Sequence, residues 1–275
     1  MKFYKDIVAQ LDDAQTLPGK SGRPAAFHYH SWSTESIKRF WTIWTTNRAL
    51  KNQFYPIVYW EDLLAWVRSQ IRSTPSVIAD VGCGNGNLID CLLKIYPDSK
   101  ITGIDMSEES LVTARSRFEN LKNIGFQVGS LTQLPLSDDS LDLVTCTEVL
   151  EHSFPESFFG SFHEVRRVLR NGGYYLASVP LGEKASFVCC PECAAVFTPY
   201  QHMVFDIAQK EVTELLSKNR LELVAWYQAI DRTVPANSFK RMGKSLLISQ
   251  MPNLAKRLFP NPGVTGFLAR ASAQT

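Results

Sequence analysis

The sequence predicts an α/β fold in which a mostly parallel sheet is covered by helices on both faces. Residues 76–231 alternate short apolar runs with helical stretches, a spacing typical of parallel sheets. Apolar residues make up 45% and charged residues 20% of the 275-residue chain, enough to build a core. The first apolar run ends in a glycine cluster at 82–86, the usual transition from a strand to a ligand-binding helix.

Each element follows from a local pattern. Strands are expected at Val77–Val81, Ile101–Asp105, Ile124–Val128, Leu141–Thr147, Tyr174–Val179, Leu221–Ala229 and Gly263–Ala271. Helices are expected near 3–14, 33–50, 57–72, 86–95, 107–120, 156–170 and 208–219. Three zones result: an N-terminal helical cap at 1–72, a core at 73–231 with a cysteine-containing insertion at 182–205, and an extension at 232–275 that completes the sheet.

Two zones have unusual composition. Residues 27–66 hold five of the six tryptophans, which indicates either a helix-packing face or a lid over an apolar substrate. Residues 232–275 carry seven basic residues and no acidic one, although the whole chain has a net charge of only +2. Such a segment favours an anionic partner such as a membrane surface, and the alternative is a solvated face. No secretory signal or 18-residue apolar run is visible, so we expect a cytoplasmic protein with peripheral membrane contact.

The strongest motif is the turn after the first strand, Asp80-Val-Gly82-Cys-Gly84-Asn-Gly86-Asn87. Glycines allow the backbone to turn tightly and to approach a ligand. The spacing Gly-x-Gly-x-Gly differs from the dinucleotide pattern, and Asp80 would repel a pyrophosphate but can meet an ammonium group. Asp105 ends the next strand, where a carboxylate can accept hydrogen bonds from both ribose hydroxyls.

Together with 129–136, 141–152 and 168–176, these motifs resemble the class I S-adenosylmethionine-dependent methyltransferases, in particular their small-molecule branch. The resemblance spans about 76–230 and implies a Rossmann-like, seven-stranded sheet of order 3-2-1-4-5-7-6 with an antiparallel last strand. It implies S-adenosylmethionine as the cofactor. Ser130 stands where the family usually has Asp, and an Arg-Asn-Gly-Gly turn at 170–173 replaces Lys-Pro-Gly-Gly. The implied cofactor-binding residues are Asp80, Gly82, Cys83, Gly84, Gly86, Asn87, Asp105, Met106, Ser130, Leu131, Thr147 and Glu148.

His152 follows the fourth strand at the sheet edge where ligands bind, so it is the candidate catalytic base. The alternative for His152 is a role in lining the cofactor site. Glu148 and Glu151 are weaker candidates, and His28 and His30 are alternatives on the substrate side.

Cys190, Cys193 and His202 form a pattern that can hold structural zinc, because a Cys-x-x-Cys turn presents two thiolates to one ion. Ala194 occupies the position where a related motif has Gly. The other interpretation is two buried thiols without metal.

The functional hypothesis is methyl transfer to a small-molecule or lipid-linked acceptor, at oxygen or carbon. The rivals are a nucleic-acid methyltransferase and a non-catalytic cofactor-binding partner protein. No Asn-Pro-Pro-Tyr or Asp-Pro-Pro-Tyr motif for a flipped base is present, which disfavours nucleic acid. Neither the acceptor nor the oligomeric state follows from the sequence.

Overall fold

The computed structural model describes residues 1–12, 27–47, 57–228 and 265–272. Its main sheet has seven strands in the order β11-β12-β7-β6-β3-β4-β5. The strands are β3 (Val77–Val81), β4 (Lys100–Asp105), β5 (Ile124–Val128), β6 (Leu141–Thr147), β7 (Leu169–Val179), β11 (Leu221–Gln228) and β12 (Thr265–Ala271). Only β12 runs antiparallel to both of its neighbours, β7 and β11. When the seven strands are numbered along the chain with β3 as strand 1, the order read from β5 to β11 is 3-2-1-4-5-7-6. The sequence prediction of the fold class and topology is therefore confirmed.

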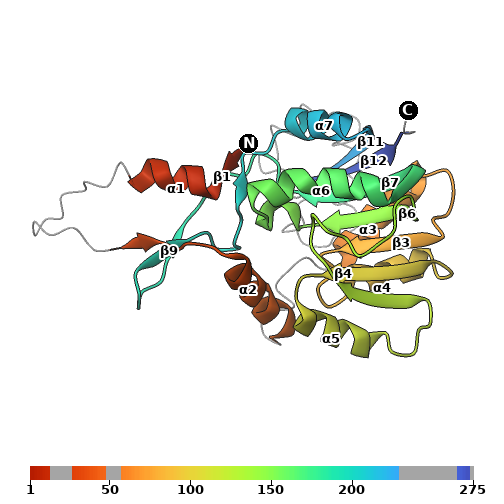
Figure 1. Ribbon diagram of the computed structural model, residues 1–275, viewed down its shortest axis with the longest axis horizontal. Helices are drawn as coiled ribbons and strands as arrows, with labels where there is room; N and C mark the ends of the chain where they lie inside the picture. The colour runs from red at the N-terminus through yellow and green to blue at the C-terminus, as the bar shows by residue number, and fades with distance from the viewer. Residues whose placement is uncertain (13–26, 48–56, 229–264, 273–275) are drawn as a thin grey trace, which may run out of the picture.

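Helices cover both faces of this sheet (Figure 1). They are α3 (Ile57–Gln70), α4 (Asn87–Ile95), α5 (Glu108–Arg117), α6 (Pro155–Val168) and α7 (Gln209–Lys218). On one face, side chains of α6 and α7 bury Phe158, Phe162 and Leu216 against the strands. On the other, α3, α4 and α5 contribute Leu63, Leu92 and Leu111 to a second buried cluster. Apolar strand residues therefore alternate between two cores, as in a doubly wound sheet.

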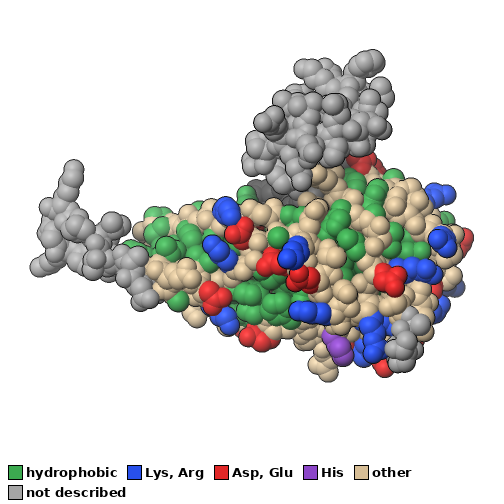
Figure 2. Space-filling view, turned by 90° about the horizontal axis from the view of Figure 1, so that it is seen from above, with side chains coloured by type: hydrophobic (Ala, Val, Ile, Leu, Met, Phe, Trp, Pro, Cys, Tyr) green, Lys and Arg blue, Asp and Glu red, His purple; other side chains and the backbone are tan. Residues whose placement is uncertain are grey.

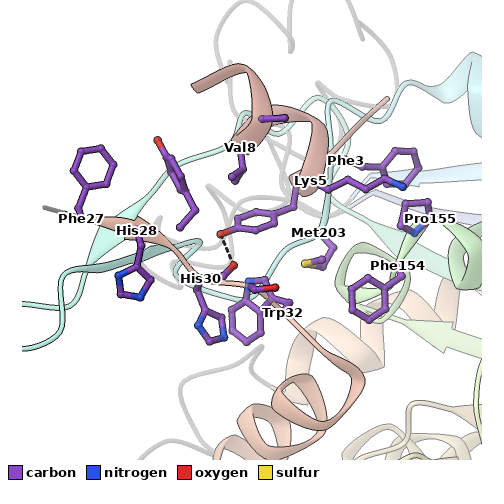
Figure 3. A pocket seen from close by; sticks show the side chains of 14 residues that line it. Phe3, Lys5, Val8, Phe27, His28, His30, Trp32, Phe154, Pro155 and Met203 are labelled. Atoms are coloured by element: carbon purple, nitrogen blue, oxygen red, sulfur yellow. Dashed lines mark hydrogen bonds between the residues drawn. The ribbon is translucent and has the colours of Figure 1, made fainter. Parts of the chain in front are cut away.

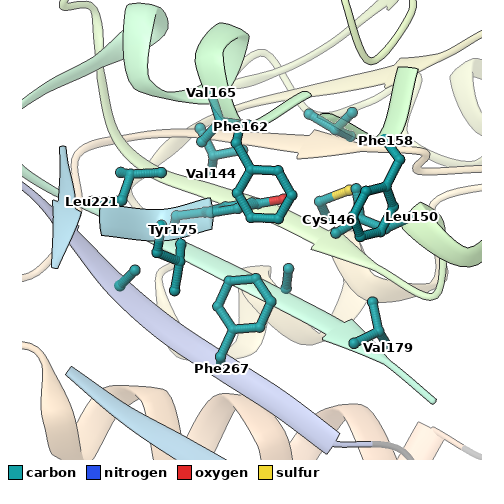
Figure 4. Packing of buried hydrophobic residues seen from close by; sticks show 14 of the residues in the cluster. Val144, Cys146, Leu150, Phe158, Phe162, Val165, Tyr175, Val179, Leu221 and Phe267 are labelled. Carbon is teal, nitrogen blue, oxygen red and sulfur yellow. The ribbon is translucent and has the colours of Figure 1, made fainter. Parts of the chain in front are cut away.

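Tyr175 of β7 lies at the centre of the first core (Figure 4). Its ring makes edge-to-face contacts with Phe162 of α6, at 6.1 Å between centroids, and with Phe267 of β12, at 5.5 Å. Such pairs add roughly 0.5–1.5 kcal/mol each to the burial of their area. The contact joins the last strand to the middle of the sheet.

The N-terminal part of the chain projects from one end of the sheet (Figure 1). It contains β1 (Lys2–Phe3), α1 (Tyr4–Asp12), β2 (His28–Tyr29) and α2 (Thr34–Thr46). Ser33 caps α2: its Oγ accepts from the Ser36 backbone N–H at 3.1 Å.

Residues 182–205 pair with this N-terminal part. They include β8 (Val188–Cys189), β9 (Ala195–Phe197) and β10 (Val204–Phe205). β10 pairs antiparallel with β1, and β9 pairs parallel with β2 and antiparallel with β8. Two segments far apart in sequence thus form one structure beside the sheet.

Only residues 265–272 of the basic segment 232–275 are described, so the expectation of membrane contact stays a prediction. No helix of the described residues is long and apolar enough to cross a bilayer.

Candidate functional site

The glycine-rich turn joins β3 to α4 with a backbone that requires glycine. Gly82, Gly84 and Gly86 have φ angles of +73°, +52° and +84°, in the left-handed region. A Cβ on Gly82 would overlap the Val149 side chain, and one on Gly86 would lie 2.5 Å from the Phe118 ring. The turn is therefore fixed by both its conformation and its neighbours.

Asp80 lies beneath this turn and is 2% exposed. Its Oδ1 accepts a hydrogen bond from Thr145 Oγ1 at 2.7 Å, whereas its buried Oδ2 has no hydrogen-bond partner. Burial raises the pKa of Asp80 to about 7, Thr145 opposes this rise, and the Asp105 charge adds to it. The orphaned oxygen suits a donor from a bound molecule, such as the cofactor's ammonium group.

Asp105 ends β4 and is held by backbone donors. Its Oδ2 accepts from the Gly84 N–H and its Oδ1 from the Ser107 N–H, both at 2.9 Å. Burial raises the pKa of Asp105, and these hydrogen bonds oppose the rise. Each carboxylate oxygen keeps a further lone pair, so the fixed carboxylate can still accept from ribose hydroxyls.

A cavity of ≈ 450 Å³ opens over these residues. The predicted cofactor residues that line it are Gly82, Gly84, Asp105, Met106, Ser130, Leu131 and Glu148. The other five do not line it. Asp80, Cys83 and Gly86 lie beneath or within the turn, and Thr147 ends β6. Asn87 faces α5, where its Oδ1 accepts from Arg117 at 2.9 Å.

The roof of the cavity comes from α2, whose residues Thr34, Ile37, Trp41 and Thr45 line it. Hydroxyl pairs fix α2 to α5: Thr42 Oγ1 lies 2.7 Å from Ser107 Oγ, and Thr45 Oγ1 lies 2.6 Å from Ser110 Oγ. Two tryptophans of the aromatic segment lie in different surroundings. Trp41 of α2 covers the cavity, whereas Trp60 of α3 packs in the core.

Sequence reasoning did not assign these α2 residues to the site. The only signal was the tryptophan density of the segment, which does not say which helix face points at the cavity.

Glu148 adopts φ +56° at the end of β6, an uncommon conformation for a residue with a side chain. Ser178 holds it there, because Ser178 Oγ donates to Glu148 Oε1 at 2.6 Å and Glu148 N donates to Ser178 Oγ at 3.1 Å. Strain of this kind concentrates at ligand sites.

His152 lines the same cavity from the 3-10 helix η1 (Leu150–His152). Its ring contacts Trp41 at 4.4 Å and His202 at 4.9 Å between centroids. Burial, together with the His202 charge, puts the pKa of His152 well below its ordinary value. The imidazole is therefore neutral near pH 7, as a proton acceptor must be.

The structure does not join Cys190, Cys193 and His202 in one metal site. His202 Nδ1 instead lies 2.6 Å from Glu183 Oε2. Among the described residues, these two cysteines belong to no group of three ligands around a common point. The turn itself forms: Ala194 takes φ +56°, and its N–H donates to the Cys190 carbonyl at 3.0 Å. The interpretation as buried thiols is wrong, since Cys193 is exposed and Cys190 is partly exposed.

The described fold is that of the Rossmann-like methyltransferases. Residues 78–173 match the family of methyltransferase domains. This match covers about a third of the chain, and the chain is similar there to class I S-adenosylmethionine-dependent methyltransferases.

Curated relatives match part of the chain. An S-adenosylmethionine-dependent methyltransferase of Mycolicibacterium smegmatis, described as probable, is 33% identical over 103 residues, which are 38% of this chain and 37% of that protein. The ubiquinone biosynthesis O-methyltransferase of Coxiella burnetii is 34% identical over 90 residues, 32% of this chain and 38% of the relative. The chain thus spans well under half the length of these relatives.

Two solved structures share the fold. One is a chain of the complex between the Haloferax volcanii Trm112 methyltransferase activator and a methyltransferase. It has a TM-score of 0.61 and 17% identity, over 88% of this chain and 99% of that one. The other is the Burkholderia thailandensis 1,6-didemethyltoxoflavin-N1-methyltransferase, solved with 1,6-didemethyltoxoflavin and S-adenosylhomocysteine. Its TM-score is 0.60 at 13% identity, over 90% and 95% of the two chains.

Proposed function

We propose that this protein transfers a methyl group from S-adenosylmethionine to a small-molecule or lipid-linked acceptor, at oxygen or carbon. One observation carries the proposal: a single cavity brings Gly82, Gly84, Asp105 and His152 together beneath α2. In parallel α/β sheets, ligands bind at this edge, beyond the carboxyl ends of the strands.

When bound, the cofactor supplies a methyl group already activated on a sulfonium. The chain then has to hold the cofactor and align the acceptor. Asp105 would accept the ribose hydroxyls, and the orphaned Oδ2 of Asp80 would accept from the ammonium end. His152 would take the proton of an acceptor hydroxyl, since its burial keeps the imidazole neutral.

A second cavity supports an acceptor with an apolar body. It measures ≈ 540 Å³ and shares Phe154 with the cofactor cavity. Figure 3 shows aromatic side chains from three parts of the chain around it, among them Phe3, Phe27 and Trp32. His28, His30 and Lys5 supply polar groups at the same cavity. The arrangement suits an aromatic or isoprenoid-like group with a polar substituent.

Nucleic acid remains the weaker alternative. On the face shown in Figure 2, basic and acidic side chains lie interspersed over the described residues. A backbone-binding surface would instead gather positive charge along a stripe.

The test is turnover of S-adenosylmethionine to S-adenosylhomocysteine by the purified chain, with phenolic or quinol-type acceptors in one set and RNA in the other. His152→Gln should leave cofactor binding unchanged in calorimetry and lower kcat about 10²-fold or more. Cofactor binding without turnover on any acceptor would favour the non-catalytic partner. Turnover on RNA alone would refute the small-molecule proposal.

A further inference from the structure

A group of ligand-type side chains lies directly behind the cofactor cavity. Glu151 and His152 come from η1, and His202 comes from the segment between β9 and β10. One ligand atom from each side chain lies within 4.8 Å of the other two. Within the described ranges, no other group of three or more His, Cys, Asp or Glu side chains converges in this way.

Buried polar atoms of Glu151 and His152 lack hydrogen-bond partners. Glu151 is 0% exposed, and neither of its carboxylate oxygens has a hydrogen-bond partner. The buried Nδ1 of His152 has none either. Leaving a buried charged group unpaired is strongly unfavourable, so such atoms are normally paired or coordinate a metal.

Hydrogen bonds tie together the two backbone segments that carry these side chains. The Met203 N–H donates to the Glu151 carbonyl at 2.6 Å, and the Gln201 side chain donates to the His152 carbonyl at 3.0 Å. The segment that carries His202 is thereby tied to η1 at two points. Ligands held in this way need little reorganisation to bind an ion.

His202 also has the second contact expected of a metal-bound imidazole. Its Nδ1 faces Glu183 Oε2 at 2.6 Å, which leaves Nε2 as the nitrogen available to an ion. Metal-ligating histidines usually donate their other N–H to a carboxylate or carbonyl, which fixes the ring and raises its basicity.

The spacing is close to that of a coordinated ion. His152 Nε2 lies 3.8 Å from Glu151 Oε1, too far for a hydrogen bond. Ligand atoms about 2.0–2.1 Å from a tetrahedral zinc ion lie roughly 3.3 Å from one another. The Glu151 and His152 side chains would therefore have to move slightly toward each other to bind the ion.

We propose that Glu151, His152 and His202 bind one divalent transition-metal ion, Zn²⁺ in the test below. Two imidazoles and one carboxylate favour zinc, iron, cobalt or nickel over magnesium or calcium. A set of three protein ligands leaves a fourth position open, as in catalytic zinc sites. Because His152 also lines the cofactor cavity, the ion would lie one side chain away from it. The site does not depend on methyl transfer, and with the ion bound His152 would act as a ligand instead of taking the proton of the acceptor.

The alternative is a neutral, protonated Glu151, because burial and the neighbouring Glu148 charge raise its pKa well above the ordinary value. A metal-free protein of that kind should not bind zinc tightly. Glu151→Gln should then leave the zinc content and the melting temperature in zinc unchanged.

The experiment measures zinc content by elemental analysis of protein purified without chelator, and zinc affinity by equilibrium dialysis against zinc chloride. Wild type should hold about one equivalent, and its melting temperature should rise on zinc addition. Glu151→Gln and His202→Asn should lose the ion, and Glu183→Gln should weaken binding about 10-fold to 100-fold. The matched control is the double variant Cys190→Ser, Cys193→Ser, which should retain it.

Cobalt substitution gives a second measurement. The cobalt-loaded protein should show ligand-field absorption without a thiolate charge-transfer band. Circular dichroism establishes that each variant is folded. If His202→Asn does not fold, Glu183→Gln still tests the site. Loss of the ion in the cysteine variant alone, or a folded wild type that binds no zinc, would overturn the proposal.

Discussion

Replacing Asp80 with Asn should stabilise the free protein at pH 8 and weaken its hold on the cofactor. The ordinary carboxyl pKa of 3.8 rises to about 7 in the folded chain. A raised carboxyl pKa gives stability that is complete below the unfolded value and is lost as pH rises through the folded value. The span from 3.8 to about 7 corresponds to about 4 kcal/mol, at about 1.4 kcal/mol per pH unit. The wild type loses this stability as pH rises from about 4 to about 8.

Asn carries no such titration. Its amide oxygen can still accept from Thr145, but its NH₂ would replace the buried oxygen that lacks a partner, at about 1–3 kcal/mol. The free energy of unfolding of Asp80→Asn, relative to wild type, should therefore increase by about 4 kcal/mol between pH 4 and pH 8. The net gain at pH 8 should be about 1–3 kcal/mol.

Urea denaturation at several pH values, without cofactor, measures both quantities, and calorimetry measures cofactor affinity. Thr145→Val is the matched control: it removes the hydrogen bond that favours the ionised form, so the pKa of Asp80 should rise further. A stability difference between Asp80→Asn and wild type that does not change with pH would refute this account of Asp80.

Three further substitutions test the cavity. Asp105→Ala should weaken cofactor binding about 10-fold to 100-fold in calorimetry, since hydrogen bonds to a charged acceptor contribute about 1.5–3 kcal/mol; unchanged affinity would contradict the ribose role. Gly82→Ala should abolish measurable cofactor binding, because the added Cβ would overlap Val149. Adding Val149→Ala should restore part of the binding. No rescue would indicate that the φ of +73° at Gly82 alone forbids a side chain. Trp41→Phe removes the 2.7 Å hydrogen bond to buried Gln201 and should cost about 1–3 kcal/mol of stability in thermal melting; an unchanged melting temperature would show that Gln201 finds another donor.

The sheet could be predicted from sequence because each of its parallel strands has a local signature. The run Val77–Val81 is apolar except for Asp80, and the glycine turn after it sets the position of α4. β7 begins at Leu169, five residues before the predicted Tyr174, because Leu169 pairs with Leu141 across a register shift that no local pattern encodes. The two-residue strands β1 and β2 were missed for a related reason. Their partners, β10 and β9, lie more than 160 residues away.

The site residues likewise fall into those that a local motif predicts and those that depend on long-range contacts. Gly82, Gly84 and Asp105 belong to a motif whose spacing alone places them at a cofactor. The meeting of His152 with His202 depends on how the segment 198–205 folds back onto η1, and the cysteine spacing suggested a different partner for His202. A short sequence distance to Cys193 was weaker evidence than the long-range contact with Glu183.

The position of β12 has a consequence for biosynthesis. This strand, at residues 265–271, fills the gap between β7 and β11, so those two strands have no direct pairing with each other. During translation, β7 and β11 leave the ribosome well before the strand that joins them. Until then both present unpaired edges, the form of a sheet most open to intermolecular pairing. Nascent chains stalled before residue 265 should therefore depend on chaperones more than the full chain does, and premature termination should yield aggregates rather than a smaller enzyme.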